Sequence, residues 1–442
     1  MKVSIGWGVM WRLDNRPAAT MSGWAVPGRN VGFLSWARNG TYRMRAACAV
    51  VLVLITAQIP GACGRDVRRD PVTNRIRILY IGDAWGPTPY TYMMEEPSFT
   101  GTPIPATYAH IGTYNDRQLR QFMRVYMPRT FDDLTTSYDL IILSDTNRGL
   151  YRADQLEWFK RGVEKTGMGL MMVGGIEAFG GKGYPTWKGS SVEEALPVEC
   201  VDGKTYEISF KVVANYPDDP FVRSLPWNTM PPFGGMNVVE PKEGAKILLQ
   251  MAAEPKHPVL VYWQYGEGSG LAHTPDWTPA WGTSVMYDWR FYPDYVVNMN
   301  FLNAGAKIPE DLDLMHDIRT RFHNYFTRRA LAISLMEFVE KFGARISPAE
   351  RSLVEIGLVE RNAEQLYLEQ AYPDALSRLQ ETEEMFRSLS DQLMALKERA
   401  LLWTYVVEWF AVTATAMICG ALLWTLMIRR RLYREVKVTR AR

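Results

Sequence analysis

Cysteine is scarce in this sequence, and its scarcity excludes two classes of protein. Only four cysteines occur among 442 residues. Cys48 and Cys63 lie in or beside an N-terminal apolar run, Cys419 lies in a C-terminal apolar run, and Cys200 stands alone. This spacing provides neither a disulfide framework nor the C-x-x-C pairs of a structural zinc site. We expect no metal and no cofactor.

An excess of charge of one sign and an internal repeat are also missing. Fifty Lys and Arg face 48 Asp and Glu, so the net charge of +2 gives no electrostatic argument for a nucleic-acid partner. No repeat at the period of a solenoid is visible. Hydrophobic residues make up 47% of the chain, which is long enough for two or three domains with a large core.

The N-terminal part reads as a targeting region. Residues 1–43 are rich in Trp, Gly and Arg without periodicity, and we interpret them as a non-native or unstructured extension before a true start at Met44. Residues 44–64 contain an uncharged run, Ala46–Ile59, which is too short to span about 30 Å of hydrocarbon but suits a signal peptide. An uncleaved anchor and a lipid-modified Cys63 remain open alternatives.

The C-terminal apolar run predicts a transmembrane helix over residues 403–428. Trp409–Ile428 gives 20 uncharged residues, about 30 Å of helix. The basic tail, residues 429–442, begins with three arginines, which the positive-inside rule places in the cytoplasm. We therefore expect a single-pass cell-membrane protein with an extracytoplasmic main domain. A buried core helix is the alternative, but such a helix rarely ends in three arginines.

Residues 70–305 predict an α/β domain. Buried strands are expected at Arg75–Asp83, Asp139–Leu143 and Gly169–Val173, with a helix over Tyr151–Lys165 between the last two. A strand, a helix and a strand with short connections predict a parallel sheet. The stretch Trp85–Ile111, rich in Pro, Gly, Tyr and Met, is interpreted as a long irregular excursion.

Residues 309–402 predict a helical hairpin or stalk. A heptad-like apolar stripe runs along its last helix, at Leu379, Phe386, Leu389, Leu393, Leu396, Ala400 and Trp403. Such stripes serve either an intramolecular hairpin or an oligomerising stalk. Glu408, at the outer boundary of the predicted span, suggests membrane-protein partners, because an ionisable residue there is commonly functional.

Polar residues follow the expected strands at their carboxyl ends, where ligands bind in open parallel sheets. They are Asp83, Asp145, Glu177, His273 and Asp276. Backbone N–H groups around Gly174 and Gly175 are candidates to hold an anion.

The runs "YDLIILSD", "GLMMVGGIEAFGGKGYPTW", "LPV" and "GSGLAHTPDWTPAWG" resemble the class I glutamine amidotransferase-like family, over roughly residues 75–305. The resemblance implies a flavodoxin-like sheet flanked by helices. It also implies a Cys nucleophile on a strand-to-helix elbow, served by a His and a Glu.

That catalytic set does not carry over to this sequence. Between Gly174 and Phe179 there is neither Cys nor Ser, and Cys200 lies outside any elbow. We interpret Cys200 as a small apolar residue, Glu177 as a solvated or hydrogen-bonded loop carboxylate, and the two glycines as a sharp turn. Three aromatic residues are expected either to line a pocket or to cover the sheet edge: Phe179, Tyr184 and Trp187.

Two functional hypotheses follow. The first is a membrane-anchored pseudoenzyme that serves as a ligand-binding or scaffold module of a membrane complex, with a ligand site at Asp83, the Gly174–Glu177 corner and the three aromatics. The second is a Cys-independent hydrolase of sugars or amides, in which Asp145, Glu177 and His273, with Asp276 nearby, perform acid–base chemistry.

Overall fold

The computed structural model describes residues 67–83, 89–108, 114–278, 281 and 284–439. The predictions for residues 1–43, for residues 44–64 and for Cys63 lie outside the described residues. Ten strands are present: β1 (Ile76–Gly82), β2 (Phe99–Pro105), β3 (Leu140–Ser144), β4 (Gly169–Val173), β5 (Val198–Tyr206), β6 (Val212–Ala214), β7 (Met236–Pro241), β8 (Lys246–Met251), β9 (Pro258–Tyr265) and β10 (Gly268–His273).

Eleven α-helices accompany these strands in the described part of the chain. They are α1 (Pro89–Glu95), α2 (Asp116–Tyr126), α3 (Phe131–Ser137), α4 (Ala153–Thr166), α5 (Ser191–Ala195), α6 (Pro220–Arg223), α7 (Ser284–Tyr287), α8 (Tyr292–Ala304), α9 (Leu312–Lys341), α10 (Ser347–Leu368) and α11 (Tyr372–Thr439). Two short 3₁₀ helices, η1 (Arg148–Leu150) and η2 (Trp227–Thr229), complete the set.

The main sheet has eight strands in the order β2-β1-β3-β4-β10-β9-β8-β6. The first five strands are parallel and the last three pair antiparallel. Five parallel strands in this order form a flavodoxin-like sheet, so the predicted fold class is confirmed. A separate antiparallel pair joins β5 and β7.

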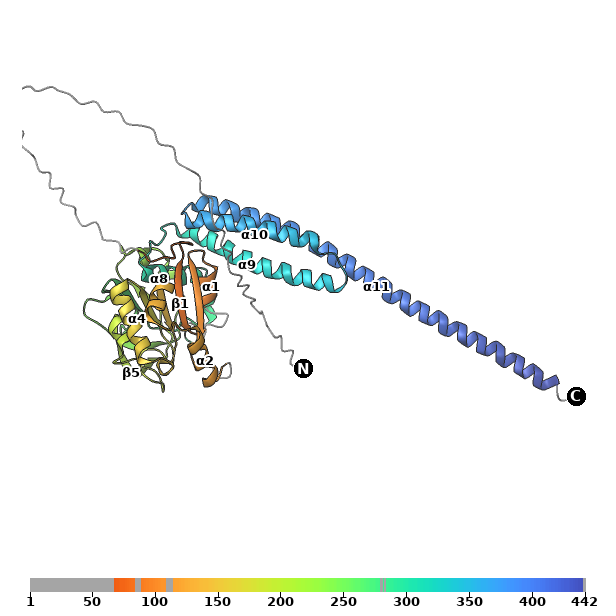
Figure 1. The fold of residues 1–442 in the computed structure, drawn as a ribbon, viewed down its shortest axis with the longest axis horizontal. Coiled ribbons are helices and arrows are strands. Elements are labelled where there is room, and N and C mark those ends of the chain that lie inside the picture. The colour runs from red at the N-terminus through yellow and green to blue at the C-terminus, as the bar shows by residue number, and fades with distance from the viewer. Residues whose placement is uncertain (1–66, 84–88, 109–113, 279–280, 282–283, 440–442) are drawn as a thin grey trace, which may run out of the picture. The chain divides into compact units, whose positions relative to one another are not determined.

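Each face of the sheet is buried under its own layer of helices (Figure 1). Along β1, Ile78 and Tyr80 enter one core, whereas Leu79 and Ile81 enter the other, as the period of two along a strand requires. The first core also contains residues of α1, α6 and α8, and the second contains residues of α2, α3, α4 and α5. The result is a three-layer domain in which the carboxyl-terminal ends of the five parallel strands lie on the same side of the sheet.

The interpretation of residues 85–111 as an irregular excursion is wrong for its described part. This stretch contains α1 and the edge strand β2, which pairs in parallel with β1. Two prolines, Pro103 and Pro105, lie in β2, and proline is tolerated there because an edge strand leaves one side of its backbone unpaired.

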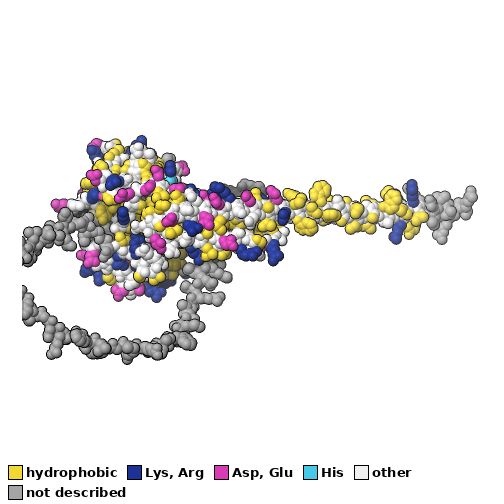
Figure 2. All heavy atoms as spheres, turned by 90° about the horizontal axis from the view of Figure 1, so that it is seen from above, with side chains coloured by type: hydrophobic (Ala, Val, Ile, Leu, Met, Phe, Trp, Pro, Cys, Tyr) yellow, Lys and Arg dark blue, Asp and Glu magenta, His cyan; other side chains and the backbone are white. Residues whose placement is uncertain are grey.

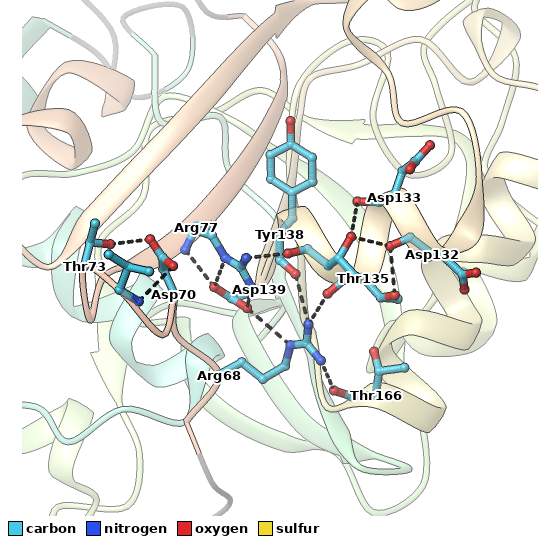
Figure 3. A network of polar contacts seen from close by, with 12 residues as sticks. Arg68, Asp70, Thr73, Arg77, Asp132, Asp133, Thr135, Tyr138, Asp139 and Thr166 are labelled. Carbon is cyan, nitrogen blue, oxygen red and sulfur yellow. Dashed lines mark hydrogen bonds and ion pairs between the residues drawn. The ribbon is translucent and has the colours of Figure 1, made fainter. Parts of the chain in front are cut away.

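At the amino-terminal ends of β1 and β3, a buried carboxylate holds the segment of chain that leads into β1 (Figure 3). Asp139 is 2% exposed and accepts two side-chain hydrogen bonds from Arg77, at 2.9 and 2.8 Å. Arg68 approaches the same carboxylate at 3.4 Å and donates to the carbonyl of Thr166 at the end of α4. Bidentate pairs of this kind fix geometry, so this network anchors residues 68–77 to α4.

After the α/β domain, α9, α10 and α11 pack side by side as a bundle (Figure 1). The heptad-like stripe of α11 is used inside this chain. Five of its members are buried against α9 and α10: Leu379, Phe386, Leu389, Leu393 and Ala400. The intramolecular use of the stripe therefore accounts for these five residues, whereas Trp403 is 67% exposed.

Beyond the bundle, α11 continues as a single helix. Every residue from Tyr405 to Tyr433 is exposed, and apolar side chains cover this segment until the arginines near its end (Figure 2). The helix is long and apolar enough to cross a membrane, with a mean hydropathy of 1.9 in its most apolar window. The predicted span thus corresponds to one candidate membrane helix at the C-terminus.

Candidate functional site

The corner after β4 is the tightest part of the predicted site. A Cβ atom at Gly174 would lie 1.9 Å from the carbonyl oxygen of Thr274, which follows β10. A Cβ atom at Gly175, whose φ is +153°, would lie 2.1 Å from the carboxyl carbon of Asp145. Both positions therefore require glycine, because any other side chain would overlap its neighbour.

The backbone donors of this corner are already engaged. The N–H of Gly174 donates to the carbonyls of His273 and Pro275, at 2.8 and 3.1 Å. The N–H of Gly175 donates to Oδ1 of Asn237 at 2.9 Å, and Asn237 returns a hydrogen bond to the carbonyl of Gly175. An anion at the two glycines would have to displace these partners.

Asn237 is a residue that the sequence did not reveal. It lies in β7, outside the main sheet, and is 1% exposed. Its side chain closes the corner from the second sheet. A single Asn within a short apolar strand carries no sequence signal for such a role.

Of the two interpretations of Glu177, the hydrogen-bonded loop carboxylate describes the structure and the solvated one does not. It has no exposed surface. Its Oε1 accepts hydrogen bonds from the hydroxyl of Thr107, at 2.7 Å, and from the N–H of Tyr108. The Glu177 N–H in turn donates to Oδ1 of Asp145 at 2.7 Å. Glu177 therefore ties the segment after β2 to the corner after β4.

The aromatic residues of the corner fill it. Phe179 and Trp187 have no exposed surface. The indole N–H of Trp187 lies 3.3 Å from the carbonyl of Thr146 and 3.2 Å from that of Glu177. Tyr184 is half-buried. These aromatics were expected either to line a pocket or to cover the sheet edge. Phe179 and Trp187 cover the sheet edge.

His273 is held as a neutral, structural side chain. Its ring packs among Phe233, Trp277 and Tyr295 in the core on the α8 face of the sheet. Nδ1 lies 2.8 Å from the carbonyl of Pro275, so Nδ1 carries the proton, and Nε2 accepts from the Tyr295 hydroxyl at 2.7 Å. Burial lowers the pKa of His273 to about 4.

Three carboxylates that the sequence placed at strand ends do meet. Asp83, Asp145 and Asp276 are at most 5% exposed. Burial raises the pKa of Asp276 to about 6. Burial, and then the charge of Asp276, raise the pKa of Asp83 and of Asp145 well above the usual range. At neutral pH Asp276 is thus the ionised member, because its charge opposes ionisation of the other two.

The hydrogen bonds of these carboxylates are asymmetric. Asp276 accepts from the backbone N–H and the hydroxyl of Thr278, at 2.7 and 2.5 Å. Asp83 accepts at Oδ1 from the Tyr80 hydroxyl at 2.9 Å, whereas its Oδ2 has no partner among the described residues. These partners explain why the charge resides on Asp276.

Comparison with known proteins assigns the middle of the chain. Residues 120–304 match the family GATase1_like, "Putative glutamine amidotransferase". This segment is a glutamine amidotransferase-like domain. Comparison with curated proteins gives no match.

Three solved structures are each similar to about half of the chain. The cytoplasmic proteins STM3548 and STM1381 of Salmonella typhimurium match 52% of this chain over 99% of their own length, with 23% and 20% identity and a TM-score of 0.44 each. The exo-β-1,4-mannosidase Op5Man5 of Opitutaceae bacterium strain TAV5 matches 52% of this chain and 36% of its own, with 12% identity and a TM-score of 0.28.

Cys200 does not supply the thiolate that an active amidotransferase uses. It lies in β5, outside the corner, and is 2% exposed. Burial, and then the charge of Glu193, raise the pKa of its thiol. A buried thiol with a raised pKa is a poor nucleophile.

The junction of the α/β domain and the helical bundle offers room for a small ligand. A cavity of about 200 Å³ lies between α1, the residues before α8, and α9. Arg319, 7% exposed, lines it and donates to Glu96 at 3.1 Å and Asp294 at 2.7 Å. Its Nη2 has no partner among the described residues. The described residues contain no group of three or more His, Cys, Asp or Glu side chains arranged to hold a metal ion.

We predict that Gly175→Ala destabilises the amidotransferase-like domain more than Gly183→Ala does. Both glycines have positive φ, but a Cβ atom at Gly183 meets nothing within 4 Å. Gly183→Ala adds backbone strain alone, about 1 kcal/mol, whereas Gly175→Ala adds a clash with Asp145 and should cost about 2–4 kcal/mol. Chemical denaturation measures both variants, and equal losses would show that the contact with Asp145 is unimportant.

A second prediction concerns the pH dependence of stability. Because the folded-state pKa of Asp276 is raised, its contribution to stability is fully present below its usual pKa and is lost as pH rises through about 6. Asp276→Asn keeps a neutral side chain of the same shape. It should therefore be more stable than the unaltered protein near pH 8, by up to about 3 kcal/mol, with the gain disappearing near pH 4.

Unfolding free energies of this variant across that pH range measure the effect. Asp218→Asn, at an exposed aspartate, is the control and should run parallel to the unaltered protein at every pH. A loss of stability at high pH in Asp276→Asn would show that the carboxylate charge has a favourable partner.

Proposed function

We propose that this chain is a membrane-anchored, extracytoplasmic protein whose amidotransferase-like domain has lost amidotransferase chemistry and acts as a scaffold or ligand-binding module. The observation that carries the proposal is the closed corner after β4. The two glycines that open the corner have no space for a Cβ atom, and the residues from Ile176 to Ala178 include neither Cys nor Ser.

The other parts of a catalytic set are likewise engaged in structure. The N–H groups of Gly174 and Gly175 are bonded within the protein, so they provide no preformed oxyanion hole. His273 is neutral, buried and bonded at both ring nitrogens. The cavity beside Arg319 is the better candidate for a ligand than the corner, since Phe179 and Trp187 occupy the corner.

A Cys-independent hydrolase remains the second candidate. One observation favours it: the three buried carboxylates have separated pKa values, as acid–base pairs require. The set differs from the one that the sequence suggested. Asp145 and Glu177 are adjacent, but the partners of His273 lie in the core on the α8 face. Asp83, Asp145 and Asp276 would therefore carry such chemistry.

The purified full chain should release no ammonia from glutamine above the uncatalysed rate. This is expected because no described thiol is both exposed and placed at the corner. A coupled glutamate or ammonia assay measures the rate. Turnover that disappears in Cys200→Ala would overturn the proposal, whereas turnover that persists in that variant would point to a contaminant or to the carboxylates.

The membrane orientation is tested separately. Alkaline phosphatase fused after Pro309 should be active, and the same enzyme fused after Arg442 should be inactive, because the arginines that follow the span favour the cytoplasm. Extraction of membranes with alkaline carbonate should leave the full chain in the pellet. The reverse fusion pattern would refute the orientation, and release by carbonate would refute the anchor.

A further inference from the structure

The end of the three-helix bundle coincides with the start of the candidate membrane span. On α11, Ala400 is buried, Leu401 and Thr404 are half-buried, and every residue from Tyr405 to Tyr433 is exposed. Burial on α11 comes from its neighbours α9 and α10. The turn that joins those two helices therefore ends at the level of residues 400–404.

Packing in the bundle gives the same level independently. Met336 of α9, Ala349 of α10 and Leu393 of α11 share one cluster. Phe342 lies six residues beyond Met336, about 9 Å along a helix, which places it near Arg399, one residue before Ala400. The exposed apolar segment of α11 from Leu402 to Ile428 is about 40 Å long, close to a bilayer with its headgroup layers. Residues 402–408 then correspond to the headgroup layer.

The turn carries the residues that such a layer favours. Phe338 and Phe342 are 38% and 37% exposed, with ring centroids 5.0 Å apart. Residues 338–346 contain the exposed cations Lys341 and Arg345 and one exposed acidic residue, Glu340. On α11, Trp403 and Tyr405 are exposed at the same level, as in the aromatic belts of membrane proteins. Exposed aromatics flanked by cations suit phospholipid headgroups and their phosphates.

We propose that the α9–α10 turn, residues 338–346, lies in the phospholipid headgroup layer beside the point where α11 enters the membrane. The turn and α11 are thus two contacts with one leaflet, and the bundle is fixed against the bilayer surface. This inference rests on the proposed anchoring by α11. The occupant of the apolar surface at Phe338 and Phe342 is lipid, because these rings lie close to the level at which the exposed apolar segment of α11 begins.

Depth-dependent quenching in phosphatidylcholine vesicles that contain the full chain tests the inference. Single-cysteine variants carry a fluorophore at Phe342→Cys or at Leu331→Cys, with Cys48, Cys63 and Cys419 replaced by Ser or Ala and the buried Cys200 retained. Leu331 is the matched control, since it is an exposed apolar residue of α9 about 16 Å farther from the turn. A third sample labels the native Cys419 within the span.

Nitroxides on the lipid headgroup should strongly quench the label at position 342 and leave the label at 331 unchanged. Nitroxides on the acyl chain should quench the label at Cys419. Quenching at Cys419 without quenching at 342 would overturn the inference while the anchor stands. If the labels at positions 331 and 342 are both shielded from the quenchers and copies of the chain cross-link, the surface at Phe338 and Phe342 is covered by a second copy instead of lipid. No quenching at Cys419 would remove both the anchor and this inference.

Discussion

The close approach of Gly174 to the carbonyl of Thr274 is the constraint on which the geometry at the carboxyl-terminal ends of the parallel strands depends. It brings the ends of the parallel strands β4 and β10 together, and Asn237 bonds to both segments. The same approach leaves Gly175 directly against the Asp145 side chain. Because backbone atoms of Thr274 form most of the contact at Gly174, a larger residue at position 174 cannot be accommodated by a change of rotamer. The corner is therefore determined by the backbone before any side-chain chemistry.

Burial at the carboxyl-terminal ends of these strands determines the protonation states of His273 and of the three aspartates. Water is excluded from His273 and from the three aspartates, so each group favours its neutral form, and only Asp276 has enough donors to remain ionised near neutral pH. A neutral histidine between a carbonyl and a tyrosine hydroxyl stabilises the core without offering a base. The residue types of an active site are thus present at the carboxyl-terminal ends of the strands, but most of them serve as hydrogen-bond partners within the protein.

The sequence predicted the parts of the fold that depend on strong local patterns. Gly169–Val173 is a continuous apolar run, and the structure has a strand with the same bounds. Asp83, Asp145 and Asp276 meet because residues that follow parallel strands share an edge. By contrast, β2 has no apolar run, since an edge strand buries few of its side chains, and it was missed. The burial of Glu177 was missed because its partners, Thr107 and Tyr108, are about 70 residues away in the chain.

The α/β domain and the bundle are joined by a buried ionic contact with consequences for any scaffold role. Arg319 of α9 lies between Glu96, which follows α1, and Asp294 of α8, and His316 also bonds to Asp294 at 2.7 Å. The charge of a buried arginine must be compensated, and Arg319 has two carboxylate partners. Loss of one carboxylate would weaken this compensation, and loss of both would leave an unpaired charge in the interior. A ligand in the cavity beside Arg319 would contact α9, and α9 packs against α11, which is one continuous helix from the bundle into the candidate span.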